Sequence, residues 1–218
     1  MEIHFRQAGG NLNFKEMNNN TIRIIEKPAF VSWEEIHEVL WKAHSQNRER
    51  GINMVFSTFS GDKIRDIIEK NTGKMFIALD NNIVVGTGAI IKKKISLWCG
   101  KDDYGYLCFA SVLPNYNGMG IYKSLSECIE RETRMMGADK VLFETHEHNE
   151  RMLRNNRQKG YKCVDFKVTT TDHYNVLMVK WLDGCPYPNW YIKLQFLTRK
   201  WYRIVKYKPG KVKRFGLL

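Results

Sequence analysis

The stretch CFASVLPNYNGMGIYKSL, residues 108–125, predicts a strand that leads through two glycines into a helix. An apolar run typical of a strand ends at Pro114, and the helix is expected to extend from Gly118 to Met136. The first N–H groups of a helix have no intrahelical partner and lie at the positive end of its dipole. Because Gly118 and Gly120 carry no Cβ, an anion can approach these groups. The stretch therefore predicts a phosphate or pyrophosphate site.

Two common nucleotide-binding motifs do not fit this stretch. Lys123 stands where a dinucleotide fingerprint needs its third glycine, and no Gly-Lys-Ser/Thr of a P-loop is present. A lone Gly-x-Gly is also consistent with a plain tight turn, so the pattern alone leaves both readings open.

The order of predicted elements indicates an α/β protein of the α+β kind, with a mixed sheet flanked by helices. Ser32 and Glu35 form a capping box for a helix that Gly51 ends, and Asp80-Asn81-Asn82 is typical of a hairpin turn. Strands are expected at residues 21–27, on both sides of that turn within 74–98, and at 104–113, 140–146, 161–170 and 175–182. The other helices are expected at residues 60–73 and 149–159.

Composition favours one folded domain. A chain of 218 residues with 43% hydrophobic content suits one core. No membrane span is expected, because no run of about 18 apolar residues occurs, and no secretory signal is expected, because residues 1–20 contain no apolar stretch of the kind a signal needs. We therefore expect a cytoplasmic protein. The domain plan is a flexible lead-in at residues 1–20, a folded domain at 21–183 and a tail at 184–218.

The tail carries most of the net charge of +12, because residues 184–218 hold nine Lys or Arg and no acid. Its apolar residues recur at helical spacing, which predicts an amphipathic helix with Trp190, Leu194, Leu197, Trp201 and Val205 on one stripe. One interpretation is a helix that lies on an anionic membrane surface. The other is a helix that docks on its own domain or on a second subunit as a homodimer. Specific nucleic-acid binding is not expected, since no recognition motif accompanies the charge.

A second motif, NERMLRNNRQKGY at residues 149–161, makes the glycine pair more specific. Asn149 lies 29 residues beyond Gly120 and eleven before Gly160-Tyr161, with a predicted strand between the two motifs. Together with Val112-Leu113-Pro114 and the two glycines, this pattern resembles the GNAT superfamily of acyl-CoA N-acyltransferases. The resemblance covers about residues 21–183. It implies a mostly antiparallel, twisted sheet with helices on both faces and two strands that splay at the cofactor site.

By that resemblance the anion is the pyrophosphate of acetyl-CoA. It would be held by main-chain N–H groups of Asn117, Gly118, Met119, Gly120 and Ile121. An N–H near Val112 or Leu113 would polarise the acetyl carbonyl, and Asn149 would bridge the splayed strands and the pantetheine. The acceptor amine would attack the thioester directly.

The chain departs from the family pattern at three positions. Asn115 replaces the usual Arg or Gln, Asn156 stands where many relatives have a tyrosine acid, and Tyr106 stands where some have a carboxylate base. A CoA thiol with a pKa near 8.5 can leave as a thiolate without that acid. The candidate proton-transfer groups are Glu144 and His148. No metal is expected, because His146 and His148 lack a third ligand.

The acceptor is predicted from the first helix, where His44 and Asn47 lie one turn apart and would bind a polar substrate. The overall pattern, including the segment AHSQNRERG at residues 43–51, resembles GNAT members linked to bacterial surface-polysaccharide synthesis, so an amino sugar or its nucleotide is the expected acceptor. The alternative is a non-catalytic acyl-CoA-binding or membrane-attached scaffold, which the missing acid and base favour.

Overall fold

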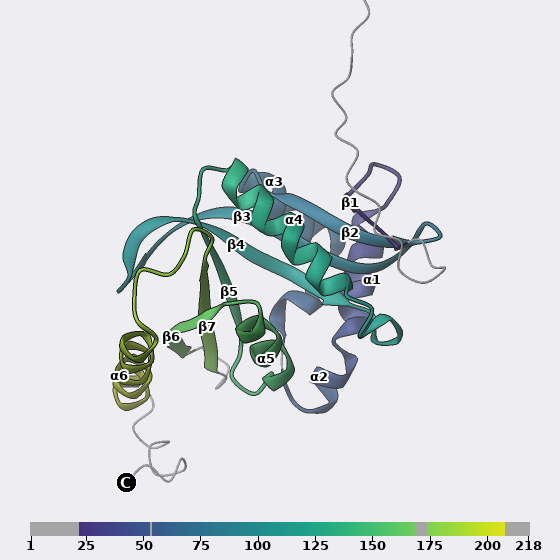
Figure 1. The fold of residues 1–218 in the computed structure, drawn as a ribbon. Helices are drawn as coiled ribbons and strands as arrows, with labels where there is room; N and C mark the ends of the chain where they lie inside the picture. The colour runs from purple at the N-terminus through teal and green to yellow at the C-terminus, as the bar shows by residue number, and fades with distance from the viewer. Residues whose placement is uncertain (1–21, 53, 169–173, 208–218) are drawn as a thin grey trace, which may run out of the picture.

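The computed structural model describes residues 22–52, 54–168 and 174–207, and the lead-in predicted for residues 1–20 lies outside them (Figure 1). The strands are β1 (Arg23–Glu26), β2 (Lys74–Asp80), β3 (Ile83–Leu97), β4 (Gly100–Val112), β5 (Lys140–His146), β6 (Lys162–Val168) and β7 (Tyr174–Trp181). The helices are α1 (Trp33–Ala43), α2 (Ser45–Glu49), α3 (Gly61–Lys70), α4 (Ile121–Met135), α5 (Glu150–Gln158) and α6 (Asn189–Tyr207), with 3-10 turns η1 (Val55–Thr58) and η2 (Pro114–Tyr116).

The strands form one mixed sheet in the order β1-β2-β3-β4-β5-β7-β6. Every neighbouring pair is antiparallel except β4 and β5, which are parallel. Helices α1 and α3 pack on one face around Ile36, Leu40 and Ile64. Helix α4 packs on the other face through Leu125 and Ile129 (Figure 1). The structure confirms the predicted α/β class with helices on both faces.

Local signals in the first half behave as predicted. The Ser32 side chain accepts from the N–H of Glu35 at 3.1 Å, and the Glu35 carboxylate accepts from the N–H of Ser32 at 2.7 Å. This capping box begins α1. Asn81 and Asn82 have φ of 48° and 68°, which gives the two-residue turn between β2 and β3 a left-handed backbone at both central positions.

The first helix differs from the prediction because it breaks at His44. Residue 44 ends α1 and precedes α2, with φ of −102° and ψ of 11°. Its side chain is buried and bonded to Asn47, while Arg48 Nη1 donates to the carbonyl of Trp41 at 2.7 Å. The Arg48 bond satisfies a backbone carbonyl where the helical bonding is interrupted.

Strand β4 contains a bulge near its end. Thr87 of β3 faces Ser111 and Ala89 faces Cys108, so β4 has one extra residue between these pairs. Phe109 lies in the bulge with φ of 51°. A left-handed backbone is costly for a bulky residue and persists where the surrounding structure enforces it. Beyond residues 105–107 of β4 and 141–143 of β5 the two strands are no longer paired. This opening is the predicted splay.

Helix α6 packs along β6 at the edge of the sheet (Figure 1). It buries Ile192 and Ile204, and the two guanidinium N–H groups of Arg203 donate to Asp165 at 3.2 and 3.0 Å. The predicted stripe is not the docking face, because Trp190 remains exposed. The sequence pattern predicted the apolar stripe correctly, but the ion pairs of α6 determine which side of the helix faces the domain. Within the described residues, no helix has the length and apolar character needed to cross a membrane.

Candidate active site

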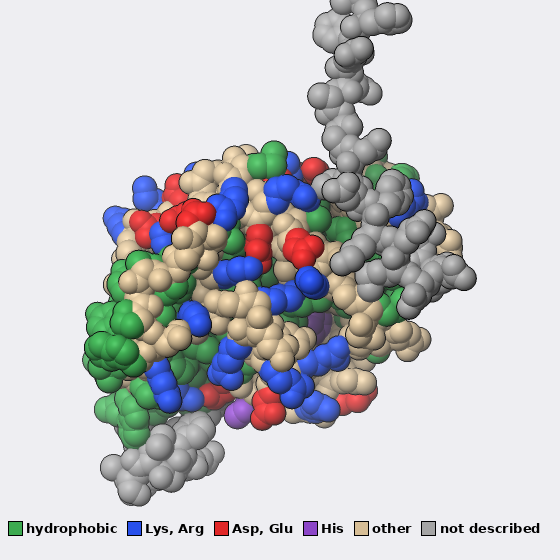
Figure 2. All heavy atoms as spheres, in the orientation of Figure 1, with side chains coloured by type: hydrophobic (Ala, Val, Ile, Leu, Met, Phe, Trp, Pro, Cys, Tyr) green, Lys and Arg blue, Asp and Glu red, His purple; other side chains and the backbone are tan. Residues whose placement is uncertain are grey.

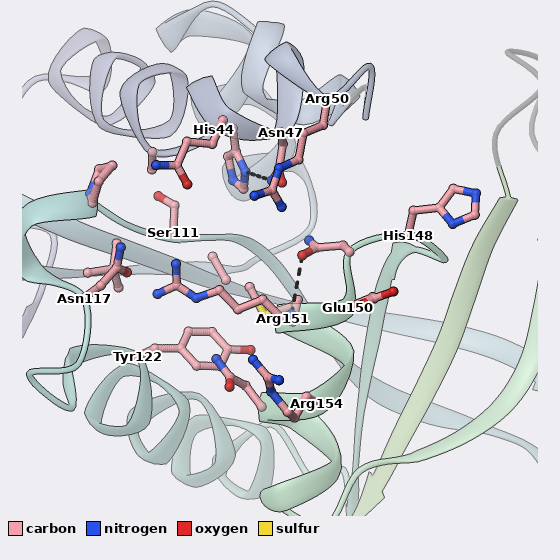
Figure 3. A pocket seen from close by; sticks show the side chains of 18 residues that line it. His44, Asn47, Arg50, Ser111, Asn117, Tyr122, His148, Glu150, Arg151 and Arg154 are labelled. Atoms are coloured by element: carbon pink, nitrogen blue, oxygen red, sulfur yellow. Dashed lines mark hydrogen bonds between the residues drawn. The ribbon is translucent and has the colours of Figure 1, made fainter.

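A cavity of about 480 Å³ lies where the α1–α2 break, the end of β4 and the start of α5 meet (Figure 3). It brings together His44 and Asn47, predicted for the acceptor, with Val112, Asn117 and Asn149, predicted for the cofactor. Its further polar lining consists of Gln46, Arg50, Ser111, Tyr122, His148, Glu150, Arg151, Arg154 and Asn155.

His44 lines this cavity and has one buried ring nitrogen without a hydrogen-bond partner in the described part of the chain. Asn47 Nδ2 lies 3.0 Å from His44 Nδ1, and because an amide nitrogen can only donate, Nδ1 is the acceptor and the ring proton resides on Nε2. Nε2 is buried and has no hydrogen-bond partner within the part of the chain that the structure describes. Burial lowers the pKa of His44 to about 4, with a smaller contribution from the charge of Arg48. The imidazole is therefore neutral at pH 7, with Nε2–H as its donor.

The hydroxyl of Ser111 is already engaged. Thr87 Oγ1 donates to the carbonyl of Phe109 at 2.7 Å, so Ser111 Oγ donates to Thr87 Oγ1 at 2.9 Å. This chain of bonds spans the β4 bulge, and Ser111 is 4% exposed. This bond holds the end of β4 in shape beside the cavity that Ser111 lines.

The N–H of Val112 points into the opening between β4 and β5. Leu113 N–H donates to the carbonyl of Val85 at 2.9 Å, which makes Val112 and Gly86 a non-hydrogen-bonded pair of the antiparallel ladder. The N–H of Val112 therefore faces away from β3. Of the two amides predicted to polarise the carbonyl, Leu113 is occupied and Val112 faces the splay.

The loop between η2 and α4 offers main-chain donors. Gly118 and Gly120 have φ of 86° and 77°, and Gly120 is the N-cap of α4 without a side-chain cap. Within the described residues, no backbone carbonyl accepts from the N–H groups of Gly118, Met119 or Gly120. The N–H of Asn117, predicted to join them, instead donates to Pro114 at 3.1 Å.

A second cavity, of about 740 Å³, follows this loop between α4 and α5. Its charged lining consists of Lys123, Arg151, Lys159 and Lys180 with the two acids Glu127 and Glu130, so cations are in excess. Arg151 and Asn155 lie on α5, and Lys159 follows at the same helical spacing as the C-cap of that helix. Arg151 lines both cavities and extends from α5 across the first one towards the loop of Asn117 (Figure 3). Lys and Arg side chains surround this region of the surface (Figure 2). The donors and cations suit an extended polyanion.

Asn149 fixes the start of α5. Its side chain accepts from the N–H of Met152 at 3.4 Å, and its Nδ2 donates to Thr145 Oγ1 at 3.2 Å. Asn149 is 8% exposed and lies on the wall of the first cavity. It therefore ties α5 to the end of β5, on the far side of the opening from Val112.

Three residues that line or brace the second cavity were missed in the sequence. Tyr122 donates from its hydroxyl to Asn156 Oδ1 at 3.0 Å, and burial raises the pKa of Tyr122 to about 12. Lys159 Nζ lies 3.7 Å from the Tyr122 ring centroid, and burial lowers the pKa of Lys159 to about 8. Arg151 is the third. The i, i+4, i+8 spacing of residues 151, 155 and 159 was the signal that could have found two of them.

The two predicted proton-transfer groups lie in different surroundings. Glu144 is the first residue of β5 beyond the segment paired with β4, and its carboxylate accepts from Asn175 at 2.7 Å and Lys167 at 3.3 Å. Burial raises the pKa of Tyr106 above its ordinary range, and the neighbouring Glu144 charge adds to that shift. His148 lines the first cavity, but its ring points away from it (Figure 3).

The model of the acetyltransferase (GNAT) family matches residues 33–161, which is more than half of the chain. The protein belongs to this family, and it is an acyl-CoA-dependent N-acyltransferase. The comparisons give no support to a non-catalytic scaffold. A comparison with curated protein sequences finds no match.

Solved structures share the fold at low sequence identity. An acetyltransferase from Streptococcus agalactiae has a TM-score of 0.56 at 17% identity, covering 74% of this chain and 98% of that one. The ribosomal-protein-S18-alanine N-acetyltransferase from Escherichia coli has a TM-score of 0.55 at 13% identity, covering 75% and 96%. A NatC complex bound to Gag peptide and CoA has a TM-score of 0.54 at 19% identity, covering 73% and 98%.

We predict that His44 stays neutral from pH 8 down to about pH 5, as followed by the NMR shift of its ring Cε1–H. The folded pKa of about 4 lies below the ordinary 6.5, so the unfolded chain binds the proton first as pH falls. The free energy of unfolding should therefore decline as the pH falls from about 6.5 towards 4, by about 3 kcal/mol for the full difference between the two pKa values. Urea unfolding of the protein and of His44→Gln isolates this contribution, since other groups titrate in both. A His44 titration near pH 6.5 would contradict the prediction.

Proposed function

We propose that the protein transfers an acetyl group from acetyl-CoA to the primary amine of an anionic small molecule, such as an amino sugar nucleotide. The observation that carries the acceptor proposal is that His44, which lines the first cavity, holds a buried Nε2–H without a partner in the described part of the chain. A buried donor without a partner is costly, and a polar substrate can satisfy it.

The donor site is supported by the loop before α4. Gly118 and Gly120 leave the backbone open, and the N–H groups at the start of α4 carry the positive end of its dipole. Lys123 and Arg151 add positive charge beside them. We propose that the pyrophosphate of acetyl-CoA binds here, with the pantetheine directed towards the opening beside Val112.

The reaction needs an acetyl carbonyl polarised beside an amine. The amine nitrogen attacks the carbonyl carbon, a C–N bond forms, the C–S bond breaks, and the sulfur leaves as a thiolate. The amine loses one proton to a base. We propose that the N–H of Val112 stabilises the negative charge on the carbonyl oxygen, since it faces the opening and the sheet leaves it unpaired.

Glu144 is the group that we propose as the base. It lies where the two strands part, beside Tyr106, which occupies the position where some relatives have a carboxylate. Asn175 and Lys167 hold its carboxylate in place. His148 is less suitable, because its ring points out of the cavity (Figure 3).

An anionic acceptor is supported by the charges of the first cavity. Arg50 and Arg154 line this cavity and are absent from the lining of the second, where the phosphates of CoA are proposed to bind. Among the described residues that line this cavity, Glu150 is the single acidic side chain, against the three arginines Arg50, Arg151 and Arg154. The surplus of guanidinium groups favours a phosphate or carboxylate on the acceptor.

The acceptor is tested by thiol release from acetyl-CoA across a panel of primary amines. We expect nucleoside-diphosphate amino sugars to be turned over faster than the free amino sugars, and peptides to be poor acceptors. Arg154→Gln should raise the KM of the nucleotide acceptor about tenfold and leave that of the free sugar nearly unchanged, because only the first carries phosphate. Faster turnover of peptides than of any sugar would show that the acceptor class is wrong.

Gly118→Asp should weaken CoA binding at least tenfold relative to Gly118→Asn. Both side chains tolerate a left-handed backbone, and a Cβ at residue 118 meets no atom within 4 Å, so the two variants differ mainly in charge. A carboxylate about 5 Å from a phosphate costs about 3 kcal/mol at an effective dielectric constant near 20. Calorimetry with CoA gives both affinities. Equal affinities would place the pyrophosphate elsewhere.

Glu144→Gln should lower kcat by about 10²-fold or more, since general-base catalysis is commonly of that size. The KM for acetyl-CoA should change little, because the amide keeps the shape and the bond from Asn175. His148→Ala is the matched control and should remain within about threefold of the parent in kcat. A larger loss in the His148 variant than in the Glu144 variant would reverse the assignment.

A further inference from the structure

Helix α6 presents an apolar surface that its own domain does not cover. We define the outer stripe as Trp190, Leu194, Leu197, Trp201 and Val205, which repeat at helical spacing. Trp190 is 68% exposed, and Leu194, Leu197 and Val205 are 49%, 43% and 53% exposed. Trp201 is partly buried and packs against the core of the domain, so the exposed part of the outer stripe is Trp190, Leu194, Leu197 and Val205. Hydrophobic side chains gather over α6 at the left edge of the molecule (Figure 2).

The helix is held by its other side, so the outer stripe is not an unfinished part of the core. Ile192 and Ile204 are buried. Arg203 and Arg199 lie 3.0 and 3.8 Å from Asp165, and Lys200 lies 3.1 Å from Glu147. These contacts fix the rotation of α6 on β6 and direct the outer stripe away from the sheet.

The outer stripe is long for a surface without a partner. Residues 190 to 205 span about 22 Å of helix at 1.5 Å per residue. Soluble monomers rarely expose contiguous apolar patches of large side chains, and such patches commonly mark an interaction site. Tryptophan in particular favours the boundary between an apolar phase and water.

The net positive charge of the C-terminal segment selects among partners. Residues 184–218 hold nine Lys or Arg and no acid, and three of the nine face Asp165 and Glu147. Lys193 is exposed on α6, and the sequence adds Lys208, Lys211, Lys213 and Arg214 after the helix. A second copy of the chain would bring two such cationic segments together, which is unfavourable. An anionic surface would attract them.

We propose that α6 attaches the enzyme to an anionic phospholipid surface. The outer stripe enters the boundary between headgroups and acyl chains, and the cations of the tail contact the lipid phosphates. Because α6 lies on β6 at one edge of the sheet, and α1 packs on the central strands β3 and β4, attachment leaves the first cavity accessible (Figure 1). The proposal is independent of which amine the enzyme acetylates.

The test is flotation of the full-length protein with vesicles of phosphatidylcholine alone or with about a quarter phosphatidylglycerol. We expect binding to the anionic vesicles only, and at least tenfold weaker binding when salt rises from about 50 mM to about 500 mM. The double variant Leu194→Glu, Leu197→Glu should bind the anionic vesicles at least tenfold more weakly than the parent, because it places negative charge in the outer stripe. Both positions are exposed, so thermal unfolding should confirm that the variant still folds.

Met135→Glu is the matched control, because Met135 is 70% exposed near the end of another helix, α4, and should leave vesicle binding unchanged. Three results would overturn the proposal. The first is binding that does not depend on phosphatidylglycerol, and the second is a folded double variant that binds as well as the parent. The third is a protein that does not bind vesicles and is a dimer by light scattering, while the double variant is a monomer. The outer stripe would then be a subunit interface.

Discussion

The parting of β4 from β5 is the constraint on which the active site depends. Pairing stops after residues 107 and 143, and the bulge at Phe109 bends β4 as the strands separate. A sheet continued to the end of both strands would bond the N–H of Val112 to β5 and close the first cavity. With the strands apart, that N–H has no partner in the sheet, and Asn149 covers the opposite side of the opening by capping α5 and bonding Thr145. The active site is thus accessible because β4 and β5 do not pair along this part of the two strands.

The surroundings of residue 156 explain how this acyltransferase can work without the tyrosine that many relatives have there. Asn156 is fully buried and accepts from Tyr122, so this position joins α5 to α4 and does not reach the reacting groups. Burial keeps the phenol of Tyr122 protonated, with a pKa near 12. A CoA thiolate is a stable leaving group near its own pKa of about 8.5, so its departure needs little assistance. The remaining requirement is to hold the amine and the carbonyl together, and positioning of this kind accounts for a large part of catalysis in two-substrate reactions.

Much of the fold could be predicted because its signals are local. The capping box of Ser32 and Glu35, the turn at Asn81 and Asn82, and the strand from residues 140 to 146 each depend on neighbours in sequence. The two motifs indicated the family because they occur in the right order with a strand between them, although the glycine pair alone is also consistent with a tight turn. The break at His44 could not be predicted in this way, since it accompanies burial of the imidazole against Phe56, which is distant in sequence and whose ring centroid lies 5.2 Å from that of His44. The roles of Tyr122 and Lys159 likewise depend on α4 and α5 meeting in space.

Helix α6 shows where periodicity stops being informative. An apolar stripe at helical spacing normally identifies the face that packs on the core, and here it lies largely outside. The reason is that the docking face is chosen by Asp165 and Glu147, two acids of the domain with side chains only 5% and 8% exposed. A buried carboxylate that loses its cationic partner is strongly unfavourable, whereas an exposed leucine costs far less. The cations of α6 therefore turn inward, and the Trp and Leu side chains turn outward as a consequence. Such an arrangement is stable in a chain only if exposing those side chains is tolerated in water or is compensated by a surface that receives them.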